Sequence, residues 1–158
     1  MDGNPEPQLG LDMGRIASDL REKGLRLTRL KRAVLRQFAD GACAFTAEEL
    51  GVRIGITGDL SPLYRCLASL EDAGVLTHLY LDEGFRRYDL ADAYGRHHHH
   101  LLCTGCASVE RIECGLAEHH VARPAHEQGY VLRDHHLVLR GLCPNCQKIS
   151  KRREARDP

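Results

Sequence analysis

The feature that most constrains this chain is a pair of C-x-x-C motifs, Cys103/Cys106 and Cys143/Cys146, with 36 residues between them. Each motif bends the chain so that two thiolates face one point, and two motifs complete the tetrahedral shell that Zn²⁺ prefers. Because protein ligands fill all four positions, the expected site is closed and structural. The gap exceeds that of a zinc ribbon, so we expect the site to hold the edge of a folded domain. A redox dithiol or a chance pairing is the competing interpretation.

Histidines are concentrated in the same half of the chain: nine of the ten lie between His97 and His136, and four form the run His97–His100. Side chains in a β-strand alternate between its two faces. If the run lies in a strand, His97 and His99 point one way while His98 and His100 point the other. One strand would then supply two ligands to each of two metal sites. The candidate partners are Asp89, Glu110, Glu113, Glu118, His119, His120, His126, His135 and His136. The alternative is a solvated polar strand.

Charge is unevenly distributed, although the chain has 22 Lys/Arg and 22 Asp/Glu and a formal net charge of zero. Residues 13–40 carry eight basic side chains against three acidic ones, and residues 41–95 carry four against nine. A local basic segment is typical of a surface that contacts nucleic-acid phosphates. A solvated basic helix face is the alternative, and composition does not decide between the two.

The N-terminal half has the pattern of short helices followed by a hairpin. Apolar spacing predicts helices over 11–23, 29–39, 47–54 and 62–73 and strands over 75–81 and 85–90. Residues suited to cap a helix stand at three helix starts: Thr28, Thr46 and Ser61, the last followed by Pro62. This order predicts a winged-helix DNA-binding domain whose fourth helix enters the major groove. Tyr64 and Arg65 lie on the polar side of that helix, where they could also be ordinary surface residues.

The C-terminal half alternates between strands and a helix. We expect strands over 97–103, 107–113 and 130–140 and a helix over 115–128, kinked at Pro124. The predicted fold class is α+β, with a winged-helix domain followed by an α/β domain. The expected organisation is a disordered N-terminus at 1–10, the DNA-binding domain at 11–90, a hinge linker at 91–96, the metal-binding domain at 97–150 and a frayed tail at 151–158.

No apolar run is long enough for a membrane span, and no basic start with an apolar core indicates a signal peptide. We therefore expect a cytoplasmic protein with no membrane partner. In that compartment C-x-x-C pairs are more often metal ligands than disulfides. Two further cysteines, Cys66 and Cys114, are expected to be buried small apolar residues without a role in the sites.

Together these segments resemble the ferric uptake regulator (Fur) superfamily of bacterial metalloregulators, over roughly residues 13–147. The resemblance is carried by GLRLTRLKRAVL at 24–35, TAEEL at 46–50, LYRCLASLEDAGVL at 63–76, RRYDLAD at 86–92, HHHHLLCTGC at 97–106 and RDHHLVLRGLCPNC at 133–146. The last two motifs are highly specific, and order and spacing agree throughout. The resemblance implies a homodimer in which the C-terminal α/β domain is the dimerisation domain. It also implies that metal at the hinge fixes the closed form that binds palindromic double-stranded operator DNA.

The resemblance also assigns residues by position. It implies a structural zinc site at Cys103, Cys106, Cys143 and Cys146. It implies a second dimerisation-domain site at His97, His99, Glu118 and His135. It implies a regulatory hinge site at Asp89, His98 and His100. It implies DNA contacts from Tyr64, Arg65 and Arg26.

Three departures from the family pattern affect these expectations. The hinge site usually takes a histidine just before the third helix, where this chain has Ala44 with Cys43 beside it. An acidic ligand is expected five residues after the second cysteine, where this chain has Arg111. SPLYR replaces the commoner ATVYR before a recognition helix whose preceding stretch is about three residues shorter than usual. The hinge site could therefore be rebuilt, and the candidate substitutes are Cys43, His78, Glu110 and Glu113.

These observations predict a metal-responsive transcriptional regulator, a repressor by the family's usual mode, and not an enzyme. The regulatory metal is expected to be Zn²⁺ or Fe²⁺, with Mn²⁺ possible, because Cys43 favours zinc whereas Asp89 with two histidines suits the harder ions equally. The alternatives are a peroxide- or manganese-responsive regulator of the same superfamily, a metal store and a metalloenzyme. The enzyme interpretation lacks a placed general base, and the storage interpretation leaves the winged-helix pattern unexplained.

Overall fold

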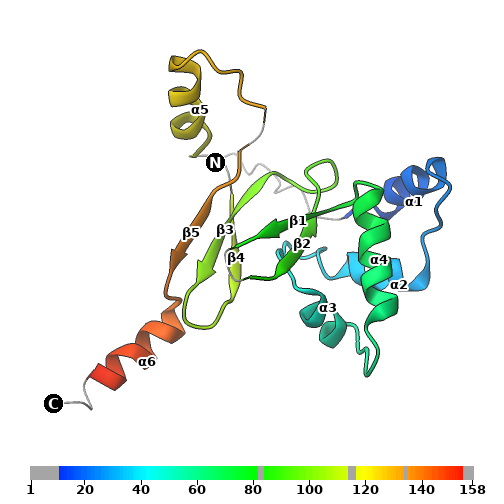
Figure 1. The fold of residues 1–158 in the computed structure, drawn as a ribbon, viewed down its shortest axis with the longest axis horizontal. Helices are drawn as coiled ribbons and strands as arrows, with labels where there is room; N and C mark the ends of the chain where they lie inside the picture. The colour runs from blue at the N-terminus through cyan, green and yellow to red at the C-terminus, as the bar shows by residue number, and fades with distance from the viewer. Residues whose placement is uncertain (1–10, 82–83, 114–116, 134, 155–158) are drawn as a thin grey trace, which may run out of the picture. The chain divides into compact units, whose positions relative to one another are not determined.

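The computed structural model describes residues 11–81, 84–113, 117–133 and 135–154, without the side chains of 117–121 and 151–154. The chain divides into two compact units, Met1–Arg96 and His97–Pro158, called unit 1 and unit 2 below. Unit 1 consists of four helices and a hairpin, and unit 2 contains a three-stranded sheet and two helices (Figure 1). This mixture of helices and separate small sheets confirms the expected α+β class.

Unit 1 is built around one apolar core. Its elements are α1 (Met13–Glu22), α2 (Arg29–Arg36), α3 (Ala47–Arg53), α4 (Ser61–Asp72), β1 (Leu76–Tyr80) and β2 (Arg86–Leu90). Each helix contributes one buried face, and the completely buried members of the core include Ile16, Leu20, Val34, Leu35, Leu50, Leu63, Leu67 and Leu70. β1 and β2 form an antiparallel hairpin, so the helices and the hairpin together have the winged-helix order.

Two of the three expected helix caps are present. The Thr28 side chain accepts a hydrogen bond from the Lys31 N–H at 3.2 Å, and Thr46 forms a capping box with Glu49. The expectation for α4 was wrong by one residue, because its N-cap is Leu60, which makes no side-chain cap bond. Asp59 accepts hydrogen bonds from both the N–H and the hydroxyl of Ser61, which therefore does not serve as a cap.

Unit 2 is a mixed sheet with two helices. Its elements are β3 (His98–Cys103), β4 (Val109–Glu113), α5 (Ala117–Glu127), β5 (Val138–Gly141) and α6 (Pro144–Glu154). The strand order is β4-β3-β5, with β3 antiparallel to β4 and parallel to β5. α5 lies in the crossover that a parallel connection requires. β3 is thus the middle strand, and His100 has a strand neighbour on both sides.

Two expectations for unit 2 were wrong. The strand expected over 130–140 is ordered as a strand only from Val138. His100 is opposite Val138 in the parallel register, and β3 begins two residues before His100, so residues 130–133 have no part of β3 to pair with. In the tail expected to be frayed at 151–158, α6 continues as far as Glu154, and the last four residues lie outside the described part of the chain. None of the helices in the described ranges is both long and apolar enough to cross a bilayer.

Candidate metal centres

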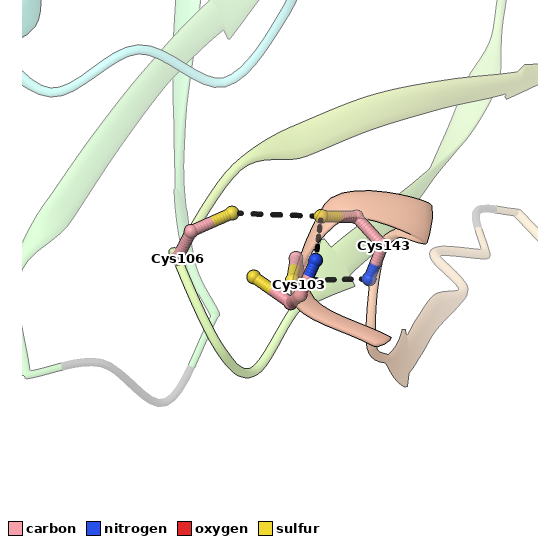
Figure 2. Close-up of side chains that lie close together, drawn as sticks. Cys103, Cys106 and Cys143 are labelled. Atoms are coloured by element: carbon pink, nitrogen blue, oxygen red, sulfur yellow. Dashed lines mark hydrogen bonds between the residues drawn. The ribbon is translucent and has the colours of Figure 1, made fainter. Parts of the chain in front are cut away.

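Four cysteines from two separate stretches meet at one end of the unit 2 sheet. Cys103 ends β3 and Cys106 follows in the turn, whereas Cys143 and Cys146 lie at the start of α6. The four sulfur atoms lie within 4.8 Å of one another. Figure 2 shows the approach of Cys106 Sγ to Cys143 Sγ, which are 3.8 Å apart. Two sulfurs bound to one tetrahedral Zn²⁺ are also about 3.8 Å apart, so the cluster fits that ion.

Backbone N–H groups hold the sulfurs in place. The N–H groups of Cys143 and Gly105 donate to Cys103 Sγ at 3.2 and 3.4 Å. These donors, the Cys143 N–H first, lower the pKa of Cys103 to about 6. The pKa of Cys146 is instead raised to about 12, chiefly by its hydrogen bond with the Cys143 sulfur. Four adjacent thiols therefore do not all ionise by themselves, whereas a bound dication would stabilise all four as thiolates.

Gly105 lies where the turn after β3 approaches the cysteines most closely. A Cβ at this position would lie 2.9 Å from Cys146 Sγ and 3.1 Å from Leu142 Cδ2. Real Cβ atoms rarely approach other atoms so closely, and either the sulfur or the turn would have to move. A glycine is thus required for the turn to close over the cluster.

The odd-numbered histidines of the run lie together with His135. One ring nitrogen from each of His97, His99 and His135 lies within 4.8 Å of the other two. The Nε2 atoms of His97 and His135 are 3.3 Å apart. Two nitrogens bound to one tetrahedral zinc ion are separated by about 3.3 Å, so this spacing suits a shared metal. The expected fourth ligand, Glu118, lies outside the residues whose side chains the structure describes.

His99 has the properties expected of a metal ligand. The side chain is completely buried, and its Nε2 has no hydrogen-bond partner among the described residues. Burial, followed by repulsion from neighbouring imidazoles, lowers the pKa of His99, so the ring is neutral at pH 7. The Leu137 N–H reaches Nδ1 at 3.3 Å, a long contact that does not fix the position of the ring proton.

The even-numbered histidines lie on the opposite face of β3. The ring centroids of His98 and His100 are 4.9 Å apart. On the neighbouring strand β4, Glu113 is opposite His98 and Arg111 is opposite His100. Arg111 Nε and Glu113 Oε1 are 2.9 Å apart, so an ion pair occupies the strand from which an acidic ligand was expected. On the β5 side of β3, His136 Nε2 lies 2.8 Å from His100 Nδ1.

Unit 1 brings a cysteine next to the expected wing ligand. Cys43 Sγ and a carboxylate oxygen of Asp89 lie within 4.8 Å of each other, and both residues are buried. Asp89 is on β2, and its carboxylate also accepts the Leu90 N–H at 2.7 Å. A thiolate and a carboxylate at this spacing can bind one metal ion together, so unit 1 presents a pair of donors and not a single carboxylate.

The loop that carries Cys43 is tightly held. Ala44 has a φ of 56°, a left-handed conformation that is uncommon for alanine. Its carbonyl accepts a hydrogen bond at 2.8 Å from Arg87, whose side chain is 2% exposed and also pairs with Glu49. Phe45 then forms a β-bridge with Tyr88, one residue before Asp89. These contacts explain why Cys43 lies beside Asp89.

The other proposed substitutes are engaged elsewhere. His78 Nδ1 contacts Glu71, which also binds Arg86 at 3.3 Å. Glu113 pairs with Arg111 as described above. Glu110 is opposite Leu101, on the other face of the sheet from His98 and His100. Among these four candidates, Cys43 lies beside Asp89, whereas Glu113, which is opposite His98 in the register, is paired with Arg111.

The expected DNA-contacting side chains are on the surface of unit 1. Tyr64 and Arg65 on α4 are exposed, as is Arg26 in the loop before α2. The Tyr64 hydroxyl donates to Glu48 Oε1 at 2.6 Å. This bond lowers the pKa of Glu48 and raises that of Tyr64. The hydroxyl is therefore engaged within unit 1.

The basic segment is only partly available for phosphates. Lys31 is 7% exposed, and Lys23 Nζ donates to the Ala73 carbonyl at the end of α4. The arginines of this segment that remain exposed are Arg15, Arg21, Arg26, Arg29, Arg32 and Arg36. A smaller set than the eight basic residues of the sequence thus faces solvent.

Comparisons with known proteins agree with this architecture. The sequence matches the Ferric uptake regulator family over residues 22–140. The chain is 34% identical to the ferric uptake regulation protein of Bordetella parapertussis, covering 83% of this chain and 96% of that one. Its structure is similar to the ferric uptake regulator of Vibrio cholerae, with 26% identity, a TM-score of 0.66 and coverage of 81% and 99%. It is also similar to a zinc-bound manganese uptake regulator, with 28% identity, a TM-score of 0.65 and coverage of 87% and 99%.

Proposed function

Because the chain belongs to the Ferric uptake regulator family, and is therefore a metal-responsive transcription regulator and not an enzyme, we propose that a regulatory divalent metal enables it to bind operator DNA as a homodimer. Repression is the proposed outcome of that binding. The four-cysteine cluster is proposed to hold a structural Zn²⁺, and His97, His99, Glu118 and His135 a second metal within unit 2.

The observation that carries this proposal is that each unit presents its own pair of donors. Unit 1 holds Cys43 next to Asp89, and unit 2 holds His98 next to His100. Two donors from each unit would complete a four-coordinate site. An ion that binds both pairs favours the one arrangement of the units in which all four donors reach it. The ligands thereby couple metal binding to the geometry in which two recognition helices meet successive major-groove faces.

Cys43 is the reason to propose zinc as the regulatory metal. A thiolate is a soft ligand, and a site of one thiolate, one carboxylate and two imidazoles matches the borderline character of Zn²⁺. Fe²⁺ and Mn²⁺ prefer more oxygen ligands, and Arg111 stands where an additional acidic ligand was expected. Iron and manganese responses are the alternatives that the metal titration below separates, and a peroxide response is a further alternative.

The exposed apolar side chains of unit 2 support its proposed role as the dimerisation domain. Several large apolar side chains are exposed on it, namely Leu101, Tyr130, Val131, Leu139, Leu142 and Ile149. Leu101 and Leu139 are neighbours in the parallel register of β3 and β5, so they form a continuous apolar surface. Apolar surface of this kind is typical of a protein–protein interface. The related V. cholerae regulator has DNA-binding domains, which supports the DNA-binding role of unit 1.

The test is fluorescence anisotropy of an operator duplex under anaerobic conditions, with Zn²⁺, Fe²⁺ or Mn²⁺ added to protein that keeps its four-cysteine metal. We expect Zn²⁺ to restore tight binding that weakens steeply with salt, since exposed arginines contact phosphates. The His98→Ala/His100→Ala variant should lose this response, whereas His126→Ala, an exposed histidine on α5, should keep it. Metal-dependent binding that survives in the double variant would contradict the proposal.

The metal preference has its own test in Cys43→Ser. Exchange of a thiolate for a hydroxyl should weaken Zn²⁺ binding at the regulatory site by about 10- to 100-fold and change Mn²⁺ binding little. Cys66→Ser is the matched control, since Cys66 is buried in the core of unit 1 away from the proposed ligands. A Zn²⁺ affinity equal to that of the parent protein would exclude Cys43 as a ligand.

A further inference from the structure

His136 is in none of the ligand sets described above, yet its ring contacts one of them. The His136 and His100 rings have centroids 4.9 Å apart and planes inclined by 52°, and His136 Nε2 lies 2.8 Å from His100 Nδ1. Both residues belong to unit 2, where His100 is in the middle strand and His136 precedes β5. The contact therefore depends only on the fold of this unit.

The separation indicates a hydrogen bond and not a shared metal. Two nitrogens on one tetrahedral zinc ion are about 3.3 Å apart, and the His97 and His135 nitrogens on the other face have that spacing of 3.3 Å. The His100–His136 distance of 2.8 Å is shorter and lies in the hydrogen-bond range. A neutral imidazole that binds metal through Nε2 carries its proton at Nδ1, so His100 would have a proton to donate to His136.

On β4, the side chain directly opposite His100 is that of Arg111, and a guanidinium has donors but no acceptor. A metal-bound histidine usually donates its second ring N–H to a carboxylate, a carbonyl or water, and this bond fixes the tautomer and the ring orientation. In this chain an imidazole on the β5 side of the sheet is placed to accept it.

We infer that His136 is a positioning residue for the regulatory metal: it accepts the Nδ1 proton of His100 and thereby directs His100 Nε2 toward the ion. The inference rests on the proposed function, because it requires that His98 and His100 bind the regulatory metal. Loss of such a partner weakens metal binding by about 10- to 100-fold while the ligand set stays the same. The two consequences, weaker affinity and unchanged coordination, can be measured separately.

The experiment compares His136→Leu with His136→Gln in the full chain that retains its four-cysteine zinc. A His97→Ala background weakens the site on the opposite face, so that the regulatory site dominates the titration. Competition against a chromogenic chelator gives the Zn²⁺ affinity, and the visible bands of bound Co²⁺ report the coordination. Glutamine keeps an acceptor near the Nε2 position, whereas leucine removes it. His98→Ala tests the proposed site, and His126→Ala is the control for loss of an exposed histidine.

We expect His136→Leu to weaken Zn²⁺ by about 10- to 100-fold and His136→Gln to stay within about threefold of the parent, with the same Co²⁺ bands in both. Parental affinity in His136→Leu would overturn the inference. Equal losses in the leucine and glutamine variants with altered Co²⁺ bands would overturn it too, because His136 would then be a ligand. If His98→Ala has no effect, the proposed regulatory site itself is wrong, an outcome distinct from failure of the His136 variants alone.

Discussion

The two units bury different kinds of side chain. Unit 1 buries apolar side chains from each of its four helices, and nine of its apolar side chains are completely inaccessible to solvent. Where burial is described in unit 2, the buried side chains are His98, His99, His100, Leu102 and Cys103. Most of these are candidate metal ligands, so the interior of unit 2 consists largely of groups that need an ion or a hydrogen bond.

This difference shows that the units depend on different interactions for stability. An apolar core stabilises unit 1 by the removal of hydrocarbon from water. A small domain without such a core usually requires a metal or a partner subunit. Metal should therefore affect the folding of unit 2 much more than that of unit 1, and substitutions in the two units should separate these contributions.

The largest effect is expected for Cys103→Ser or for prolonged treatment with a strong zinc chelator. Structural zinc sites contribute on the order of 10 kcal/mol to folding, so unit 2 should lose its ordered sheet. Unit 1 should keep its helices, because its core contains no metal ligand of the cluster. Hydrogen exchange resolved by residue, with zinc content measured in parallel, would show protection lost in β3 and β5 and kept in α2 and α4. Equal loss in both units would contradict the comparison.

The next effect in size is expected in the other unit, for Leu35→Ala. Leu35 is completely buried on α2, and removing such a side chain costs about 2–5 kcal/mol. Chemical denaturation should show this loss in the transition of unit 1, while the zinc content of the four-cysteine cluster stays at the level of the parent protein. Zinc released at the same denaturant concentration that unfolds unit 1 would mean that the units do not unfold independently.

A smaller effect is expected for Gly105→Ala. The new Cβ would lie 2.9 Å from Cys146 Sγ, so the turn should shift and loosen the cluster at a cost of about 1–3 kcal/mol. Gly141→Ala is the matched control, because nothing lies within 4 Å of a Cβ there. The rate of zinc transfer to a chelator should rise for Gly105→Ala and stay unchanged for Gly141→Ala. If both variants released zinc at the same rate, the close approach at Gly105 would be unimportant.

The smallest effect is expected for Tyr64→Phe on the surface of unit 1. The pKa of Glu48 is lowered mainly by the Tyr64 hydroxyl, so it should rise toward its ordinary range in the variant. Because a lowered carboxyl pKa stabilises the fold above the unfolded pKa, the difference between parent and variant should be present at neutral pH and disappear as pH falls through the folded pKa. This difference in the free energy of unfolding should stay under about 1 kcal/mol, since the Tyr64–Glu48 pair is exposed.

Carboxyl-carbon NMR titration of Glu48, combined with urea denaturation at several pH values, measures both quantities. Tyr130→Phe, at an exposed tyrosine of unit 2, is the control and should change neither the pKa of Glu48 nor the stability of unit 1. An unchanged Glu48 pKa in Tyr64→Phe would show that the bond does not persist in solution.

Local signals predicted most of the secondary structure. Thr28 and Thr46 cap the helices that follow them, and the alternation of the histidine run correctly separated His97 and His99 from His98 and His100. The start of β5 was not predictable in this way, because it depends on where β3 begins. α6 was missed because the second C-x-x-C motif was interpreted only as a ligand pair, although Pro144 suits the first turn of a helix.

The finer arrangement of the candidate sites depends on contacts between distant segments. Cys43 lies beside Asp89 because a β-bridge joins Phe45 to Tyr88 and because Arg87 holds the Ala44 carbonyl. No periodicity in the sequence encodes that bridge. The contact of His136 with His100 likewise follows from the register of β5 against β3. The two residues are 36 positions apart, and the sequence does not show that register.

That register gives the four-cysteine cluster a second consequence. β3 ends at Cys103, and β5 is followed within two residues by Cys143, so an ion bound there would clamp the ends of two parallel strands. The histidines lie at the opposite ends of the same strands. A slip of β5 by one residue would turn every side chain to the other face and exchange His135 with His136 between the two histidine clusters. Zinc bound by the four cysteines would thus fix the register of β5 against β3 and keep His135 in one histidine cluster and His136 in the other.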